Sequence, residues 1–319
     1  MTERRIVTVT GEVSPSELGF CQCHEHILMA KGKSFEINAT LCIDDPAKSE
    51  EEVLSYKAAG GEAIVEAQPV GCGRMADGLK TISEKTGVKI ISSTGFHKML
   101  FYPDNHWIMK MTAGQLENLF VTELTEGMYI DPDMELPQRQ IAARAGQIKT
   151  AYDVEGLTDR YQVLFRGAAA AAKKTGAPMM IHIENGTDPR PLLVFLKEEG
   201  VNPKQLIFCH MDRACKDVEW HKEIASSGAY LEYDTIGRFK YHSDEREIEI
   251  MKEMIAAGYE DQLLFSLDTT RARLGAYGGD ITLTYLIQEF IPQMKAAGIA
   301  DAVIDKMAYA NSAAAMSWK

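Results

Sequence analysis

The stretch GFCQCHEHI, residues 19–27, is the segment from which the fold can first be inferred. Its alternating residues are typical of a β-strand, and this alternation turns Gln22, His24 and His26 toward one face. Two imidazoles spaced two residues apart on a strand can reach one metal ion. Taken alone, the pair is equally compatible with two histidines that satisfy hydrogen bonds in a core or at a surface.

Seven more short apolar runs follow, and most are succeeded by a segment of helical period. The runs are 62–68, 88–95, 146–151, 178–183, 205–210, 229–234 and 262–268, and the helical segments include 113–128, 158–175, 217–227 and 281–297. In one of these helices Thr158 can cap the first turn and Gly176 can end the last. Eight strands alternating with helices predict an α/β fold, a (β/α)8 TIM barrel. A doubly wound open sheet shares the local pattern, but the strand count favours the barrel.

The whole chain, residues 1–319, is expected to form a single barrel domain. No Pro/Gly/Ser-rich linker, composition shift or internal repeat divides it, and 45% hydrophobic content is enough for one large core. The longest interruption between strands, residues 97–145, is predicted to be an excursion over the barrel mouth, where such enzymes vary most.

Charge and composition limit the class of partner and the compartment. A formal net charge of -12 argues against a nucleic-acid-binding face, so a small-molecule substrate is expected. The amino-terminal residues lack the apolar core of a signal peptide, and no apolar run approaches membrane-spanning length, so a cytoplasmic protein without a membrane partner is predicted. The six cysteines are scattered and are expected to be reduced and mostly buried.

Three further candidate ligands stand at the ends of later strands. His182 closes PMMIHI, His210 closes QLIFCH, and Asp268 closes QLLFSLD. Each alone could be an ordinary hydrogen-bonding residue at a strand end. The carboxyl ends of barrel strands gather at one mouth, however, so together with His24 and His26 these residues predict a metal centre there.

Lys149, in the strand at 146–151, is unusual because a lysine facing a barrel interior loses its hydration. One interpretation is that its amine extends to the rim. The other is that CO2 has converted the amine to a carbamate that bridges two metal ions. Two dications about 3.5 Å apart repel by roughly 19 kcal/mol at an effective dielectric constant near 20, so bridging anions are needed.

The motifs HEH, IKT, MIHIE, FCHMD and SLDTTR occur in this order. With them the chain resembles the phosphotriesterase-like branch of the amidohydrolase superfamily, nearest to the phosphotriesterase homology proteins and phospho-sugar lactonases. The resemblance covers essentially the whole chain, including GEVSPSELGFCQCHEHIL and YDTIGRFKYHSDE.

The resemblance implies a hydrolase with a binuclear metal centre. The implied ligands are His24, His26 and Asp268 for the more buried ion, His182 and His210 for the exposed ion, and a carboxylated Lys149 bridging both. Some relatives carry a glutamate in place of this lysine. Zinc is the expected metal, and manganese or cobalt can substitute. A hydroxide that bridges the ions would attack the substrate, and Asp268 would pass the proton to the leaving group.

The chain departs from organophosphate-degrading phosphotriesterases at two positions. Thr235 and Arg213 stand where those enzymes have the histidine and aspartate of a proton relay, which argues against efficient organophosphate hydrolysis. Basic residues gather instead in the loops after the strands. The candidate substrate contacts are Arg213, Arg238, Lys240, Arg271, Arg273 and Tyr277, with Lys31 and Lys33 also in these loops. Such side chains can hold a phosphate, although any one could be a solvated surface charge.

The sequence therefore predicts a lactonase that opens phosphorylated furanose lactones. A carboxylesterase, phosphodiesterase or phosphotriesterase on the same centre is the alternative within enzymes, and a binding protein that has lost its chemistry is the alternative outside them. Family members are commonly dimers, so a homodimer is also considered.

Overall fold

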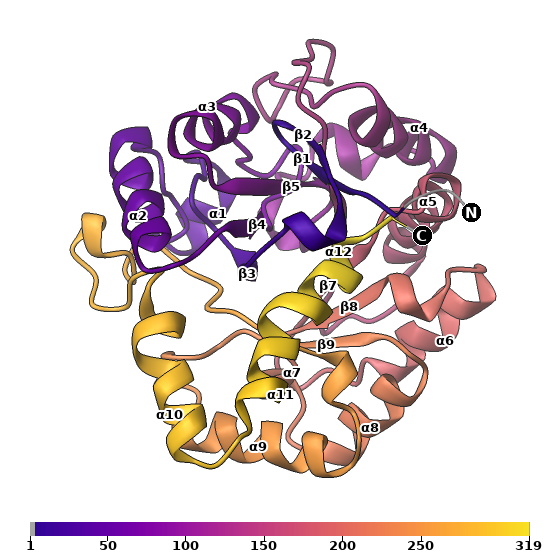
Figure 1. Cartoon of the computed structure of the whole chain (residues 1–319). Helices are drawn as coiled ribbons and strands as arrows, with labels where there is room; N and C mark the ends of the chain where they lie inside the picture. Colours follow the sequence, from indigo (N-terminus) through magenta and orange to yellow (C-terminus); the bar gives the residue numbers. More distant parts are fainter. Residues whose placement is uncertain (1–3, 319) are drawn as a thin grey trace.

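The computed structural model describes residues 4–318 and contains eight parallel strands in one sheet, as the sequence predicts. The strands are β3 (Cys21–Glu25), β4 (Ala63–Glu66), β5 (Lys89–Gly95), β6 (Gln147–Tyr152), β7 (Met179–Ile183), β8 (Leu206–Cys209), β9 (Tyr230–Tyr233) and β10 (Leu263–Phe265). Each strand is hydrogen-bonded to the next in chain order. Figure 1 shows the strands converging at the centre, with the helices around them. The TIM barrel is confirmed.

The helices surround the sheet and account for most of the predicted helical segments. They are α1 (Lys33–Ile37), α2 (Pro46–Ala58), α3 (Ala76–Thr86), α4 (Ala113–Thr125), α5 (Asp159–Thr175), α6 (Arg190–Glu198), α7 (Met211–Ala214), α8 (Val218–Ser226), α9 (Asp244–Ala256), α10 (Ile291–Ala296), α11 (Asp301–Asp305) and α12 (Ser312–Met316). In α5 the Thr158 side chain accepts from the Tyr161 amide, and Gly176 ends the helix at φ 81°. Both ends were predicted from the sequence.

The continuous helix predicted over 281–297 is wrong in its first half. A π-helix spans Leu286–Phe290, and α10 begins only at Ile291. Pro292 has no amide hydrogen to donate to the preceding turn, so regular helical bonding cannot run through it. Further upstream, the Thr282 hydroxyl lies 2.6 Å from the Thr284 hydroxyl and accepts from its amide, which offers the backbone an alternative to the helix.

The seam between β3 and β10 is joined through side chains. The Glu25 carboxylate is fully buried and accepts from the Ser266 hydroxyl at 2.7 Å, the Leu267 amide at 2.9 Å, and the Thr269 amide and hydroxyl at 3.1 and 2.7 Å. The Asp268 amide donates to the His24 carbonyl at 3.0 Å across the same seam. Closing the barrel therefore brings the first and the last predicted metal ligands together.

The amino end of the barrel is closed by the two ends of the chain. Strands β1 (Ile6–Thr8) and β2 (Gly11–Val13) form a hairpin there, and α12 lies across the barrel axis (Figure 1). The Trp318 amide donates to the Arg5 carbonyl, and its indole donates to the Gly146 carbonyl just before β6. Apolar residues of α12 pack on the apolar interior of the strands. The carboxyl end is left for the functional site.

The segment 97–145 contributes to both the mouth and the outer helical layer. Its first residues, His97, Lys98 and Phe101, line the cavity described below. Helix α4 instead packs closely against α5, where a Cβ on Gly167 would lie 2.6 Å from the Leu116 side chain. The predicted excursion thus reaches the mouth with its beginning, while α4 belongs to the outer layer.

Two predictions from composition are tested by the structure. All six cysteines are free and buried, as expected for reduced thiols. None of the helices in residues 4–318 combines the length and the apolar composition that a membrane crossing requires.

Replacement of Glu25 by alanine should destabilise the closed barrel. It would leave the buried amides of Leu267 and Thr269 without an acceptor, and each such loss costs about 1–3 kcal/mol. We expect the free energy of unfolding to fall by about 3 kcal/mol or more, measured by urea denaturation. Glu84→Ala, which removes an exposed partner of Lys80, is the control. Equal losses in the two variants would contradict the assigned role of Glu25.

Candidate metal centre

The predicted histidines meet at the carboxyl end of the barrel, with one ring nitrogen of each directed toward the others. His182 Nδ1 lies 2.8 Å from His210 Nε2. His24 Nε2 lies 3.0 Å from Lys149 Nζ and 3.8 Å from Asp268 Oδ1, and His26 Nε2 lies 3.5 Å from the same oxygen. The structure thus brings all the predicted metal ligands into one cluster.

The opposite ring nitrogen of each histidine faces a carboxylate. Asp234 serves two rings, with Oδ2 at 3.0 Å from His24 Nδ1 and Oδ1 at 2.6 Å from His210 Nδ1. His182 Nε2 lies 3.2 Å from Glu184, and His26 Nδ1 lies 3.5 Å from Glu66. A carboxylate behind an imidazole fixes the tautomer and leaves the lone pair on the other nitrogen, which is the arrangement of metal-binding histidines.

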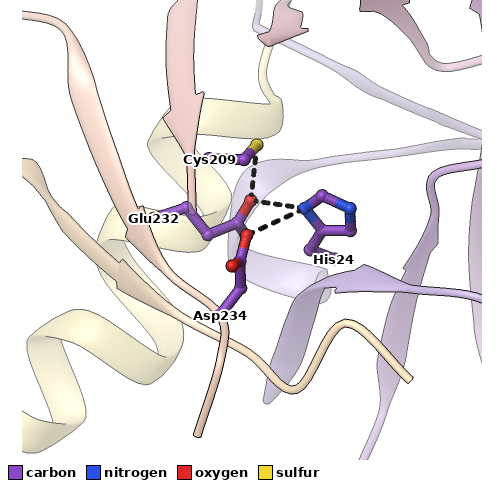
Figure 2. Close-up of side chains that lie close together, drawn as sticks. All are labelled: His24, Cys209, Glu232 and Asp234. Atoms are coloured by element: carbon purple, nitrogen blue, oxygen red, sulfur yellow. Dashed lines mark hydrogen bonds and ion pairs between the residues drawn. The ribbon is translucent and has the colours of Figure 1, made fainter. Parts of the chain in front are cut away.

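The carboxylates of Glu232 and Asp234 both face the same ring nitrogen of His24 (Figure 2). Glu232 Oε2 lies 3.2 Å from His24 Nδ1 and accepts from the Cys209 thiol at 3.0 Å. Burial and the negative charge of Glu232 raise the pKa of Cys209 well above its usual value. The thiol therefore stays protonated as a donor to Glu232, and these residues support His24 rather than forming a metal site themselves.

Burial keeps most of these imidazoles neutral. Burial lowers the pKa of His24 to about 4 and the pKa of His182 to about 3. Burial lowers the pKa of His210 well below its usual value, with the Arg213 charge as the next cause. Burial opposes ionisation of His26 too, but Asp268 and Glu66 outweigh it and raise its pKa to about 9. Neutral imidazole is the form that binds metals.

Two of the clustered residues have a strained backbone. His210 has φ 61° and Asp268 has φ 49°, and they are the non-glycine residues with positive φ in the described chain. This region is disfavoured for side chains with a Cβ, although aspartate and histidine enter it more readily than most. Strain of this kind concentrates at functional sites, where the surrounding structure enforces it. Here it turns both side chains into the mouth directly after their strands.

The side chains present fit a pair of metal ions. With their outer nitrogens donating to Glu184 and Asp234, His182 Nδ1 and His210 Nε2 both present lone pairs, and two lone pairs 2.8 Å apart repel unless a cation lies between them. His24, His26 and Asp268 offer a second set of ligand atoms that lie within 4.8 Å of one another. The donor set of imidazoles and a carboxylate is one that zinc commonly uses.

Lys149 lies between the two sets of ligand atoms. It is fully buried, and its amine contacts His24 Nε2 at 3.0 Å and Met180 Sδ at 3.4 Å, neither of which carries a negative charge. An ammonium group in this position would lose its hydration without a carboxylate in direct contact. The surroundings therefore suit a derivative of the amine better than the free cation.

A cavity of about 230 Å³ opens above the cluster and has a basic mouth. Arg213 Nη1 donates to the Tyr241 hydroxyl at 2.9 Å, and Lys240 Nζ lies 4.7 Å from the centre of the same ring. Arg238 Nη2 lies 3.1 Å from Asp268 Oδ2. Lys98 donates to Glu184 at 2.6 Å, so its charge is already paired. Among the described residues of the mouth, Arg213 and Lys240 form no ion pair with a carboxylate.

The other predicted substrate contacts lie outside this lining. Arg271 pairs with Asp44 at 3.2 Å and stacks on Tyr277, whose hydroxyl donates to the Asp45 carbonyl. Arg273 is buried, and its guanidinium donates to backbone carbonyls, although it lines a neighbouring hollow with Arg238 and Lys240. Lys31 and Lys33 face Phe35 and Glu36. A substrate-binding role for Arg271, Arg273 and Tyr277 remains a prediction.

Sequence reasoning missed the residues behind the histidines. Glu184 follows His182 by two residues, and Asp234 directly follows a strand, so strand-end position was a usable signal for both. His97, Lys98 and Tyr241 also line the cavity but come from loops whose course no periodicity reveals. Thr235, which stands where organophosphate-degrading phosphotriesterases have the histidine of the proton relay, donates its hydroxyl to Asp212 at 2.5 Å.

Comparison with known proteins extends these findings. The model of the phosphotriesterase family matches residues 4–315. A phospho-furanose lactonase of Mycoplasmopsis synoviae is 29% identical over 93% of this chain and 88% of its own. An N-acetyltaurine hydrolase of Danio rerio is 26% identical over 96% of both chains. The crystal structure of a lactonase from Listeria monocytogenes superposes with a TM-score of 0.89 at 27% identity, covering 99% of both chains.

Asp234→Asn should weaken metal binding while preserving the fold. An asparagine amide cannot supply the carboxylate that accepts from His210 Nδ1 and lies 3.0 Å from His24 Nδ1, and loss of such partners costs about 10–100-fold in metal affinity. We expect that loss for Zn2+ in competition with a chelator, with an unchanged circular dichroism spectrum. Asp301→Asn, at an exposed ion pair, should bind Zn2+ like the unaltered chain. Unchanged affinity in Asp234→Asn would refute the positioning role.

Proposed function

The chain belongs to the phosphotriesterase family, and on that premise we propose that it is a metal-dependent lactonase that opens phosphorylated furanose lactones. The observation that carries the proposal is the convergence of imidazole lone pairs beneath a basic mouth. The lactonases among its relatives support the choice of reaction, because they match over nearly the whole chain.

The metal centre would be held as follows. One ion would be bound by His24, His26 and Asp268, the other by His182 and His210, with a carbamate on Lys149 shared by both. Zn2+ is the metal that this donor set favours, and Mn2+ or Co2+ could substitute. The ions would supply Lewis-acid polarisation of the lactone carbonyl and activation of the attacking water.

The side chains around the ions have separate tasks. Burial tends to raise the pKa of Asp268, but the charge of Arg238 and hydrogen bonding with His26 hold it well below its usual value. Asp268 is therefore a carboxylate that can take the proton lost by the attacking water and deliver it to the ring oxygen that leaves. The buried walls around Lys149 and His24 exclude bulk water from that transfer.

The basic mouth would hold the phosphate of the substrate. Arg213 and Tyr241 are joined by a hydrogen bond, and Lys240 adds a second cation beside the same ring. Charge-assisted hydrogen bonds from such groups suit a phosphate dianion. The protein carries a net charge of -12, so a local concentration of positive charge at the mouth favours an anionic substrate.

A second candidate is hydrolysis of an amide that carries a sulfonate. The specific observation in its favour is the similarity to the N-acetyltaurine hydrolase of Danio rerio over 96% of both chains. A sulfonate would use the same cations, so the mouth alone does not separate the two substrates. The distinction lies in the bond that is broken, an ester or an amide.

The substrate assignment is tested by kcat/KM on a 1,4-lactone with and without its 5-phosphate, beside N-acetyltaurine, p-nitrophenyl acetate and a phosphodiester. We expect the phosphorylated lactone to be preferred. Lys240→Ala should raise KM about 10-fold for that substrate and leave the unphosphorylated lactone little changed. Lys197→Ala, at an exposed position on α6, serves as the control. A lack of preference for the phosphate, or faster cleavage of the amide, would reject the lactone.

The carbamate is tested at Lys149 independently of the substrate. Lys149→Glu supplies a carboxylate in place of a carbamate, whereas Lys149→Met supplies no anion at a comparable length. We expect Lys149→Glu to retain substantially more bound Zn2+ than Lys149→Met in elemental analysis. Metal-depleted wild-type protein should also reload Zn2+ faster with added bicarbonate. Equal Zn2+ retention in the two variants, with no effect of bicarbonate, would contradict a carbamate.

A further inference from the structure

A second cluster of possible ligands lies behind the mouth, between the ends of β8 and β9. Asp212 comes from α7, His242 from the loop between β9 and α9, and Glu247 from the first turn of α9. His242 Nε2 lies 3.2 Å from Glu247 Oε2 and 3.8 Å from Asp212 Oδ2. One ligand atom from each residue lies within 4.8 Å of the other two.

Glu247 is the member of this cluster whose carboxylate receives no hydrogen bond from the described residues. Its side chain is fully buried, and within residues 4–318 neither carboxylate oxygen accepts a hydrogen bond. Burial and the neighbouring charges of Asp212, Asp234 and Asp244 raise the pKa of Glu247 well above its usual value. A buried carboxyl group beside other acids needs a proton or a cation, because the energy of an uncompensated charge in the interior is high.

The spacing of the atoms suits a small cation. Four ligands about 2.0–2.2 Å from a metal at tetrahedral angles stand about 3.3–3.6 Å apart. The distances from His242 Nε2 to the two carboxylates, 3.2 and 3.8 Å, bracket that range. The Thr235 hydroxyl, 3.1 Å from the same nitrogen, is a third oxygen and a fourth possible ligand atom at the cluster. One imidazole with two carboxylates favours Zn2+ or Mn2+ over Mg2+, which prefers oxygen ligands alone.

The cluster is separate from the proposed binuclear centre. The described residues that line the cavity do not include Asp212, His242 or Glu247. The Asp212 side chain accepts from the Thr235 amide at 2.7 Å and from the Thr235 hydroxyl at 2.5 Å. We propose that Asp212, His242 and Glu247 bind a third divalent cation, which fastens the loop between β9 and α9 to the end of β8.

The loop that this cation would hold carries the basic mouth. Arg238, Lys240 and Tyr241 lie on it between Thr235 and His242. The loop has few apolar anchors at its tip, since Phe239 is 61% exposed and Tyr241 is 36% exposed. A cation at its base would fix the approach of these side chains to an anionic substrate without touching the substrate.

The test counts Zn2+ in the full chain after dialysis against rising free Zn2+, with the binuclear centre loaded. We expect the wild-type protein to bind one more Zn2+ per chain than Glu247→Gln. Anomalous scattering should place this ion beside Glu247. Glu249→Gln, at an exposed position on the same helix, should retain it. The added Zn2+ should also raise the melting temperature of the wild-type protein but not of Glu247→Gln.

His242→Gln provides a second variant, because its side chain is partly exposed and its loss threatens folding less than a change at Glu247. Circular dichroism establishes that each variant is folded. Loss of the additional Zn2+ in a folded His242→Gln supports the site even where Glu247→Gln fails to fold. The proposal is overturned where wild type and folded variants bind equal Zn2+ at every concentration. These outcomes are independent of which substrate is hydrolysed.

Discussion

The arrangement of the site depends on the Asp234 carboxylate, which lies between the imidazoles of His24 and His210. It accepts from the outer nitrogen of His210 at 2.6 Å and lies 3.0 Å from that of His24, whose hydrogen bond goes to Glu232, so it faces one ring from each of the two proposed metal positions. With both outer nitrogens committed, both lone pairs must point into the mouth. Asp234 also accepts from the His210 amide at 3.1 Å, which helps to hold that residue in its left-handed conformation. One buried carboxyl group thus fixes the tautomer, the ring orientation and the backbone of His210.

The barrel makes this interaction possible by dividing its interior into two unlike ends. The amino end is filled by apolar side chains and closed by α12, whereas the carboxyl end holds buried histidines and carboxylates. The seam at Glu25 joins the first strand to the chain after the last strand, and the Asp268 amide bonds to the His24 carbonyl there. Two ligands distant in sequence become neighbours because the barrel closes at that point. The hydrogen bonds that stabilise the seam therefore also hold the proposed metal ligands His24 and Asp268 in position.

The sequence allowed prediction of those parts of the fold and site that periodicity determines. The alternation of side chains along a strand predicts the direction of the His24 side chain. The positions of His182, His210 and Asp268 at strand ends predict that they lie at the same end of the barrel. The carboxylates behind these rings were missed because their partners become apparent only when neighbouring strands are placed in register. Loop residues have no period, so the sequence could not show that Arg271 pairs with Asp44 while Lys240 lines the cavity. Pro292 is a signal in the sequence against a continuous helix over 281–297.

The acidic groups behind the histidines create a need for cations at the carboxyl end of the barrel. Asp234, Glu232 and Glu66 stand behind the histidines as buried carboxylates, and Glu184 stands behind His182 with 22% of its side chain exposed. Their negative charge increases the electron density of the imidazoles, yet it is costly in the interior without nearby cations. Lys98 compensates for Glu184 directly, and metal ions would compensate for the others through the rings. Metal binding and the stability of this end of the barrel are consequently coupled, because the ions neutralise a charge that folding has already buried. The basic groups at the rim lie beyond this balance, and they remain available to an anion that enters from solvent.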